Sequence, residues 1–460
     1  MLKHKFCSEC WASKWEYIKY ITLFWIIMLK LDIRFIPIHR AEGIHYYGIY
    51  VFELFGIYFL ARLLQSCFCG KLENRFIVML KWLLVFILYY AGLFCVRVLT
   101  GNNCADSLMV FRSVFWICIC VVYFLHRGKW EKELYSCYIG MVVLQGAELF
   151  FYMMDGYWRN IFGLPSVLIA LSPFMIPAGW MVLDAYRFKF HSACWVFIGS
   201  FFSVAIIIIS GARIGLLMLL VSLVGGFCIV GFKVNAKQAY KVMVGYLVML
   251  SFFACFVCIS DMGGARNSMI RATGGLIYSP IVALLENDDK EGIIWALVTE
   301  YDEHFRRFFE ILPEEKQGVL FHNPTGISDV YRALAIRMAL DELSGDWMFH
   351  LQGDTLLHIP TGDVVSVSGA HNAVLDYCLA FGACGVAIIF SMWFYWLFQF
   401  WEIRHNIAME EWWAVMLILL GILLNGMFQA MFNNFHNLVL PVLLLAVVDL
   451  KNQEKYLSQE

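Results

Sequence analysis

Apolar runs of membrane length recur along the chain, and they limit its possible folds more than any other feature. One run extends from Ala373 to Phe400 with Asp376 as its only charged residue. A helix of about 20 apolar residues crosses the hydrocarbon core of a bilayer. The chain is 61% hydrophobic and 15% charged, whereas soluble domains average about 25% charged residues. We therefore expect an all-α polytopic membrane protein.

The apolar runs also predict the domain organisation. We expect about twelve transmembrane helices, nine within residues 1–260 and three within residues 372–460. Residues 261–371 lie between these groups as one large, partly helical external loop. The expected spans are 18–38, 44–69, 76–99, 108–125, 134–154, 165–183, 193–210, 214–232, 242–260, 373–400, 412–430 and 437–450.

Lysine and arginine residues between the spans predict the orientation, because cytoplasmic connections are enriched in them. With both termini cytoplasmic, 17 of these residues lie in cytoplasmic segments. The short external connections hold four, which are Arg34, Arg40, Arg159 and Arg213. This asymmetry places the loop 261–371 on the outer side of the membrane.

The external loop is acidic and carries two helical patterns. Residues 261–370 contain 17 acidic and 8 basic residues, a balance of −9. Apolar residues recur at helical spacing from Ile294 to Phe308, and a second helix is expected from Ser328 to about Leu343. Glycine and proline then predict irregular structure over 345–369. A connection of this length is usually functional, and its apolar helix faces indicate a cap on the membrane domain.

Two arginines stand out in this acidic loop. Arg332 and Arg337 are candidates for a diphosphate clamp, because a guanidinium presents a planar fork to phosphate oxygens. The alternative is ion pairing at the surface with Asp329, Asp341 or Glu342. For Arg337 the pattern favours this alternative.

Arg213 lies in a tight external break between two apolar runs. A charge at that depth is costly unless it is paired or lines a polar cavity. Gly211 and Gly215 flank it and favour a narrow, packed site. The alternative is that the side chain extends to lipid phosphates at the outer surface.

Arg97 and Arg112 flank the short external connection 100–107. Two cations at the level of the headgroups can cradle a lipid diphosphate. They can equally extend to the membrane surface or pair with Glu148 or Asp155. The sequence slightly favours these two alternatives, taken together, over the cradle.

His371 stands where the polar loop meets the apolar run from Ala373. Gly382 follows eleven residues later, about three helical turns or roughly 16 Å along one helix face. Gly382 and Gly385 would let a neighbouring helix approach closely. The alternative for His371 is an interfacial helix cap bonded to Asn372 or to a loop carbonyl, and Asn372 is itself a further candidate. In the last external turn, His436 lies in a polar cluster with Asn433, Asn434 and Asn437, whose groups suit sugar hydroxyls but are also ordinary in turns.

Three of these segments together resemble the O-antigen ligase and polymerase superfamily of bacterial envelope glycan enzymes. The residues that carry the resemblance are Ser210 to Arg213 with Leu217, Arg332 with Ala339 and Leu340, and His371 and Asn372 with Gly382 and Gly385. The resemblance covers roughly residues 200–400 in order and spacing. It departs from the family pattern at Ile336, where a tryptophan is usual.

The resemblance implies a glycosyltransferase in the inner membrane of a bacterium, with the loop 261–371 in the periplasm. Because the chain has no Asp-x-Asp pair and no histidine-rich ligand spacing, we expect this enzyme to use no metal and no cofactor. Its donor would be an oligosaccharide linked to undecaprenyl diphosphate, and its acceptor a sugar hydroxyl on the outer face. His371 would activate or orient the acceptor, while Arg213 and Arg332 hold the diphosphate. Further substrate contacts are expected from Arg97, Arg112, Arg337, Asn372 and His436.

Several functions remain open at this stage. We favour a polymerase of lipid-linked repeat units, because the loop is divergent and repeat units vary. A ligase that transfers the glycan to lipid A-core has the same layout. A flippase or transporter would explain charges within the spans, and cell-wall polymerases and structural scaffolds are further alternatives. The expected partners are the lipid-linked donor, the acceptor glycan, membrane lipid and a chain-length regulator, and no nucleic acid is expected.

Overall fold

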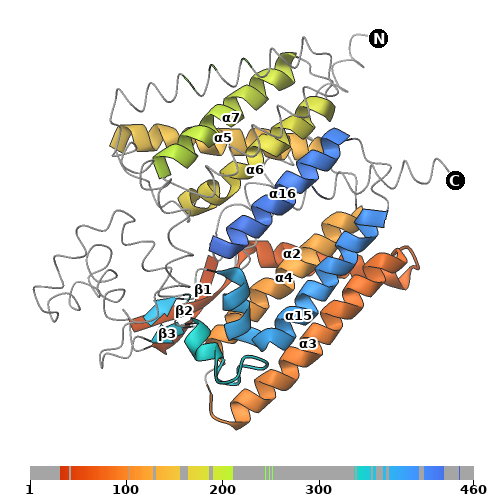
Figure 1. The fold of residues 1–460 in the computed structure, drawn as a ribbon, viewed down its shortest axis with the longest axis vertical. Coiled ribbons are helices and arrows are strands. Elements are labelled where there is room, and N and C mark those ends of the chain that lie inside the picture. Colours follow the sequence, from red (N-terminus) through yellow and green to blue (C-terminus); the bar gives the residue numbers. More distant parts are fainter. Residues whose placement is uncertain are drawn as a thin grey trace, which may run out of the picture.

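The computed structural model describes part of the chain, and that part is largely helical. It describes residues 32–40, 43–102, 104–127, 131–155, 164–185, 190–210, 339–353, 356–358, 366–368, 372–402 and 409–428, with single residues at 244, 248, 251, 336 and 445. Helices and strands below are those of the described residues. Figure 1 shows how they are arranged.

Four helices form a first group, in which α15 packs on α3 and α4 although it lies far from them in sequence. The members are α2 (Val51–Phe68), α3 (Asn74–Leu99), α4 (Ala105–Arg127) and α15 (Ala373–Glu402). Aromatic rings fill the space between them. The ring of Tyr90 stacks on Phe111 with centroids 4.2 Å apart, and Phe381 of α15 meets Tyr90 edge-on.

Three further helices form a second group, in which α7 contacts both α5 and α6. These are α5 (Glu131–Asp155), α6 (Leu164–Ala185) and α7 (Phe190–Ser210). Helix α16 (Met409–Phe428) contacts α6 and α15, so it joins the two groups (Figure 1).

A neutral polar cluster ties the second group together. The Gln145 side chain of α5 donates to the hydroxyls of Ser172 in α6 and Ser203 in α7, each at 3.0 Å. All three side chains are fully buried. Each serine hydroxyl also donates to a carbonyl four residues earlier in its own helix.

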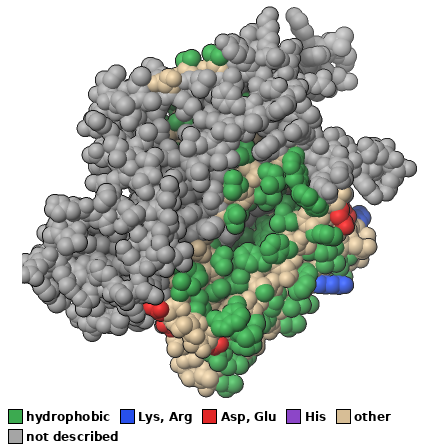
Figure 2. Space-filling model, in the orientation of Figure 1, with side chains coloured by type: hydrophobic (Ala, Val, Ile, Leu, Met, Phe, Trp, Pro, Cys, Tyr) green, Lys and Arg blue, Asp and Glu red, His purple; other side chains and the backbone are tan. Residues whose placement is uncertain are grey.

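The described helices have the length and the surface of membrane-spanning helices. Four are long and apolar enough to cross a bilayer, namely Asn74–Leu99, Asp106–His126, Leu134–Met154 and Ala373–Glu402. In Figure 2, hydrophobic side chains cover most of the described surface of the first group, and the few charged ones lie near its edges. The protein is therefore a largely helical membrane protein.

Most expected spans that fall on described residues coincide with helices to within a few residues. The span expected at 76–99 is α3, which begins two residues earlier and ends at Leu99. The spans expected at 108–125, 134–154, 165–183, 193–210, 373–400 and 412–430 correspond to α4, α5, α6, α7, α15 and α16. The spans expected at 214–232, 242–260 and 437–450 lie outside the described residues, apart from isolated positions.

The first two expected spans are partly wrong. Strands β1 (Asp32–Arg40) and β2 (Gly43–Tyr50) pair as an antiparallel hairpin where helices over 18–38 and from residue 44 were expected. Isoleucine, phenylalanine and tyrosine are frequent here and favour strands. The charges of Asp32, Arg34 and Arg40 would also be costly inside a bilayer. The second span therefore begins as a helix only at Val51.

The prediction of irregular structure over 345–369 is also wrong in part. Strands β3 (Leu356–His358) and β4 (Ser366–Ser368) pair antiparallel. They are only three residues each, and a three-residue strand gives too short an alternation to be recognised among glycines. Residues 339–343 are helical and fall within the helix expected from Ser328 to about Leu343.

Candidate functional site

Helix α15 is broken at Gly382, close to the point where the external loop joins it. Gly382 has φ 67° and ψ 169°, which are not helical values, and Figure 1 shows α15 bent before its long C-terminal part. A β-carbon at this position would collide with the main chain at Met348 and Phe349. Only glycine combines this dihedral angle with so close an approach. The span expected over 373–400 therefore consists of two helical parts joined at Gly382, while His371 lies outside the described residues and its position relative to Gly382 stays a prediction.

The carbonyls freed on the N-terminal side of the break accept hydrogen bonds from α3. The Tyr89 hydroxyl donates to the Phe381 carbonyl at 2.7 Å. The Arg97 guanidinium donates through Nη1 to the Ala380 carbonyl at 2.9 Å. Buried carbonyls without a donor are costly, so these two side chains stabilise the break.

The amides freed on the other side of the break donate to a segment that precedes α15 in the chain. The Ala383 amide donates to the Trp347 carbonyl at 2.9 Å, and the Cys384 amide donates to the Met348 carbonyl at 3.1 Å. The long part of α15 thus begins with two amides bound to backbone of the segment 346–353. We call this segment the docked segment.

Arg97 also binds the docked segment directly. Its Nη2 donates to the His350 carbonyl at 2.7 Å, and its side chain is fully buried. A β-carbon on Gly353 would lie 2.6 Å from the Arg97 Cζ, so the glycine backbone lies flat against the guanidinium. One side chain of α3 therefore joins the broken helix to the loop.

Further contacts hold the docked segment in shape and in place. The Asp346 carboxylate accepts from the amides of Phe349 and Leu351, at 3.4 and 3.0 Å. The Asn102 side chain donates to the Leu351 carbonyl at 2.9 Å. The connection 100–107 and the loop 261–371, which the charge pattern assigns to the same side of the membrane, are thus in contact.

The close helix approach predicted at Gly385 is confirmed. A β-carbon there would lie 2.9 Å from the Tyr89 ring of α3. This approach brings the Tyr89 hydroxyl to the break. Gly385 therefore allows α15 to pack closely on α3, whereas Gly382 allows the break in α15.

Arg97 and Arg112 do not form the shared cradle that the sequence suggested. Arg97 is committed to the carbonyls of Ala380 and His350. Arg112 of α4 binds both carboxylate oxygens of Glu53 in α2, at 2.5 and 2.9 Å. Its partner is thus neither Glu148 nor Asp155. Both guanidinium groups donate hydrogen bonds to protein oxygen atoms, which argues against direct binding of a diphosphate by either of them.

Asn372 begins α15. Its side-chain oxygen accepts from the amides of Val374 and Leu375 at 3.0 and 3.1 Å, and its carbonyl accepts from the Asp376 amide. This is an N-cap. The sequence had offered a cap as the alternative role of His371, whereas the capping oxygen belongs to Asn372. The cap also fixes the helix start directly after His371.

The remaining predicted site residues lie outside the described part of the chain. They are His371, Arg213, Arg332, Arg337 and His436. Their roles stay predictions. In the described part, no group of three or more histidine, cysteine, aspartate or glutamate side chains is arranged to hold a metal ion.

The sequence interpretation missed Tyr89, Gly353 and the docked segment. Tyr89 resembles any aromatic residue of a span, and its role follows only from the position of the Phe381 carbonyl. Asp346 followed by an aromatic residue is an ordinary turn signal. The usable signal was Arg97 itself, since a charge in a span is expected to have a specific partner.

In the part of the chain that the structure describes, the arrangement is that of a largely helical membrane protein in which helix α15 is broken at Gly382 and bound there by the docked segment. No protein-family model matches this sequence, and no curated protein and no solved structure is detectably similar to it.

Proposed function

We propose that the protein is a membrane glycosyltransferase that joins glycans linked to undecaprenyl diphosphate on the outer face of the cytoplasmic membrane. The activity that we favour is the polymerisation of O-antigen or capsule repeat units. The proposal rests on the ordered set Arg213, Arg332 and His371 in the sequence. The fixed start of α15 supports it, because the Asn372 cap follows His371 directly.

The chemistry of such a transfer fits these residue types. The acceptor hydroxyl oxygen bonds to the anomeric carbon of the donor, and the bond from that carbon to the diphosphate oxygen breaks. The hydroxyl proton passes to the imidazole of His371, which titrates in a suitable range. Arg213 and Arg332 stabilise the negative charge that grows on the departing undecaprenyl diphosphate.

Preorganisation is the second reason for the proposal. A catalytic group must be held close to its productive geometry by a supported backbone. The first part of α15 receives hydrogen bonds from Tyr89 and Arg97 of α3, and the docked segment binds the second part. The histidine that directly precedes this helix, His371, is therefore attached to a helix whose backbone is stabilised on both sides of the break.

A transporter is a second candidate, because a broken helix is a feature that transporters use. In them, the freed backbone groups bind ions or substrate. At Gly382, the carbonyls of Ala380 and Phe381 and the amides of Ala383 and Cys384 are bound by other parts of this chain. The break thus has the form of an attachment point, which favours the enzyme.

The decisive experiment measures the reaction itself. The full-length protein in nanodiscs receives the lipid-linked repeat of its source strain, and we expect free undecaprenyl diphosphate together with a ladder of polymer. His371→Ala should lower this release at least a hundredfold, and activity should persist in EDTA. His405→Ala is the control, because His405 lies in a connection expected on the opposite side.

Two results would contradict the proposal. The first is full activity of His371→Ala at normal protein levels. The second is accumulation of lipid-linked glycan on the far side of sealed vesicles without a new glycosidic bond, which is the product of a transporter. A deletion strain separates the two enzymes, since loss of a polymerase leaves single-repeat glycan and loss of a ligase leaves free lipid A-core with long chains.

A further inference from the structure

The docked segment presents apolar side chains to its surroundings although its backbone is tied to the protein. The exposed fractions are 60% for Trp347, 43% for Met348, 44% for Phe349 and 38% for Leu351. We call these four residues the apolar tip. Four large apolar side chains within five residues are an unusual surface for a loop in water.

The apolar tip continues a surface of α3 that is itself apolar and exposed. The Arg97 bond to His350 and the Asn102 bond to Leu351 hold the docked segment against the end of α3. At that end, Val98 is 55% exposed and Leu99 is 86% exposed. Since α3 has the length and composition of a membrane span, its exposed apolar side chains face lipid.

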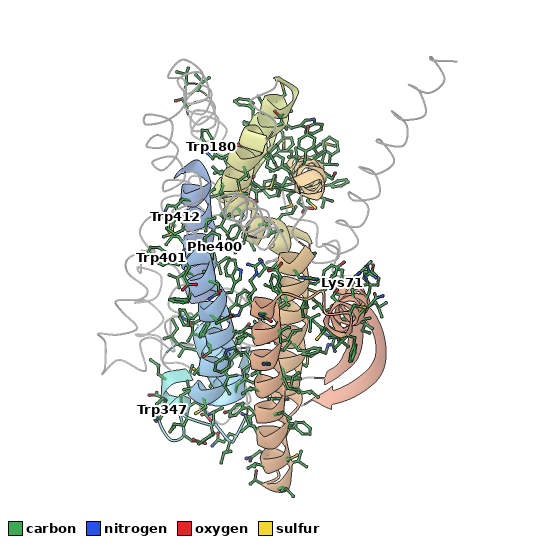
Figure 3. The ribbon with its side chains drawn as sticks, turned by 90° about the vertical axis from the view of Figure 1, so that its right-hand side faces the viewer. Lys71, Trp180, Trp347, Phe400, Trp401 and Trp412 are labelled. Carbon is green, nitrogen blue, oxygen red and sulfur yellow. The ribbon has the colours of Figure 1, made fainter. Side chains whose placement is uncertain are left out.

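The length of α15 indicates the depth in the membrane at which the apolar tip lies. The part of α15 after the break, 383–402, has 20 residues and is about 30 Å long, which matches the hydrocarbon thickness of a bilayer. Trp347 is bound at its first residue, and Trp401 is exposed near its last. Figure 3 shows the two tryptophans towards opposite ends of this helix. Exposed tryptophans mark both interfaces of membrane proteins.

The distribution of charge around the apolar tip favours lipid over a polar partner. Residues 339–353 contain no lysine or arginine, and the Asp346 carboxylate is used by two amides of the segment itself. The tip therefore offers apolar contact without a charge that would select an anionic headgroup or an acidic protein. The interface of a bilayer satisfies this chemistry.

We propose that the apolar tip inserts into the bilayer interface and anchors the external loop to the lipid surface. The boundary of the hydrocarbon then crosses α15 at the Gly382 break. The first part of α15, which begins at Asn372, stands above that boundary among the headgroups. The proposal needs no assumption about the reaction that the protein catalyses.

Photo-crosslinking of the full-length protein tests the anchor. The photoreactive residue p-benzoylphenylalanine replaces Trp347, Phe349 or, as a control, the exposed Glu342, which precedes the docked segment. Each variant is irradiated in phosphatidylcholine nanodiscs, and lipid adducts are quantified by mass spectrometry. We expect at least tenfold more adduct at 347 and 349 than at 342, with little change between low and high salt.

Each other outcome overturns the proposal. Equal adduct at all three positions means that the tip does not insert selectively. Crosslinks from 347 to a second copy or to another part of this chain mean that protein covers the tip. Hydroxyl-radical labelling of the unmodified protein is independent of variant folding. Trp347 should then be labelled as slowly as the buried Trp396, and labelling several times faster would contradict insertion.

Discussion

Each helix group contains a buried polar contact, and the two contacts differ in kind. In the second group, the neutral side chain of Gln145 binds those of Ser172 and Ser203. The first group uses a charged side chain, Arg97, whose hydrogen bonds end on backbone carbonyls at a broken helix. In one case polar side chains bind each other, and in the other a side chain replaces missing helix hydrogen bonds.

This difference predicts where the protein is sensitive to substitution. Polar contacts between intact membrane helices contribute little on average, because the alternatives in the membrane also offer partners. Backbone groups at a helix break have no such alternative, since an unpaired carbonyl in an apolar interior costs its full desolvation. We therefore expect large effects at the break and small effects in the Gln145 cluster.

Arg97→Met should have the largest effect. It removes the side-chain donor to the Ala380 carbonyl and leaves the His350 carbonyl with the Gly353 amide alone, and we expect a loss of about 3–5 kcal/mol in unfolding free energy. Arg97→Lys should lose less, because an ammonium can keep one of the two bonds. Unfolding in mixed micelles measures both.

The matched control for this prediction is Arg62→Met. Arg62 is exposed and donates to Gln65 within its own helix, so its loss should be within about 0.5 kcal/mol of zero. Equal effects at positions 97 and 62 would show that the buried guanidinium does not stabilise the break.

Gly382→Ala should have the next largest effect on stability. The β-carbon has to displace the backbone at Met348, and the φ of 67° is strained for alanine, so we expect a loss of about 2–4 kcal/mol. Amide hydrogen exchange at Ala383 and Cys384 should also become faster, because their acceptors lie in the docked segment. Unchanged exchange would contradict the attachment.

Gly70→Ala is the control that separates the cost of the strained dihedral angle from the cost of steric overlap. Gly70 has φ +64°, but a β-carbon there would meet nothing within 4 Å. Alanine at this position should cost only about 1 kcal/mol, which is the strain of the dihedral angle. The difference between the two variants then measures the contact with the docked segment.

Tyr89→Phe should have an intermediate effect. It removes only the hydroxyl that donates to the Phe381 carbonyl, and we expect a loss of about 1–2 kcal/mol. Tyr58→Phe is the control, because Tyr58 is exposed on α2 and its substitution should change little. Chemical unfolding of the two variants in the same micelles provides the measurement, and a Tyr89→Phe loss no larger than that of Tyr58→Phe would contradict the contact.

The sequence predicted the helices well where apolar character and length agree. The span at 76–99 is an example, since α3 extends over Asn74–Leu99. It failed over 32–38, because a run of isoleucine and phenylalanine fits a strand as well as a helix. Charged residues such as Arg34 were the available warning.

The candidate site was harder to predict, because its contacts join distant parts of the chain. Arg112 meets Glu53 across 59 residues, and Arg97 meets Ala380 across 283. No local pattern encodes such partners. The left-handed conformation of Gly382 also depends on the carbonyl of Met348, which belongs to another segment. The sequence could show that Arg97 needs a partner but not which one.

Gln145→Leu gives the smallest expected effect and the most direct test of the comparison. Leucine is similar in size and removes the amide that joins Ser172 and Ser203, while both hydroxyls keep their carbonyl acceptors at Leu168 and Gly199. No buried donor is left without an acceptor, so we expect a change of about 1 kcal/mol or less. Unfolding in the same mixed micelles as Arg97→Met measures it. A loss as large as that of Arg97→Met would mean that neutral contacts between helices contribute as much as the support of a broken helix, and the contrast between the two groups would be wrong.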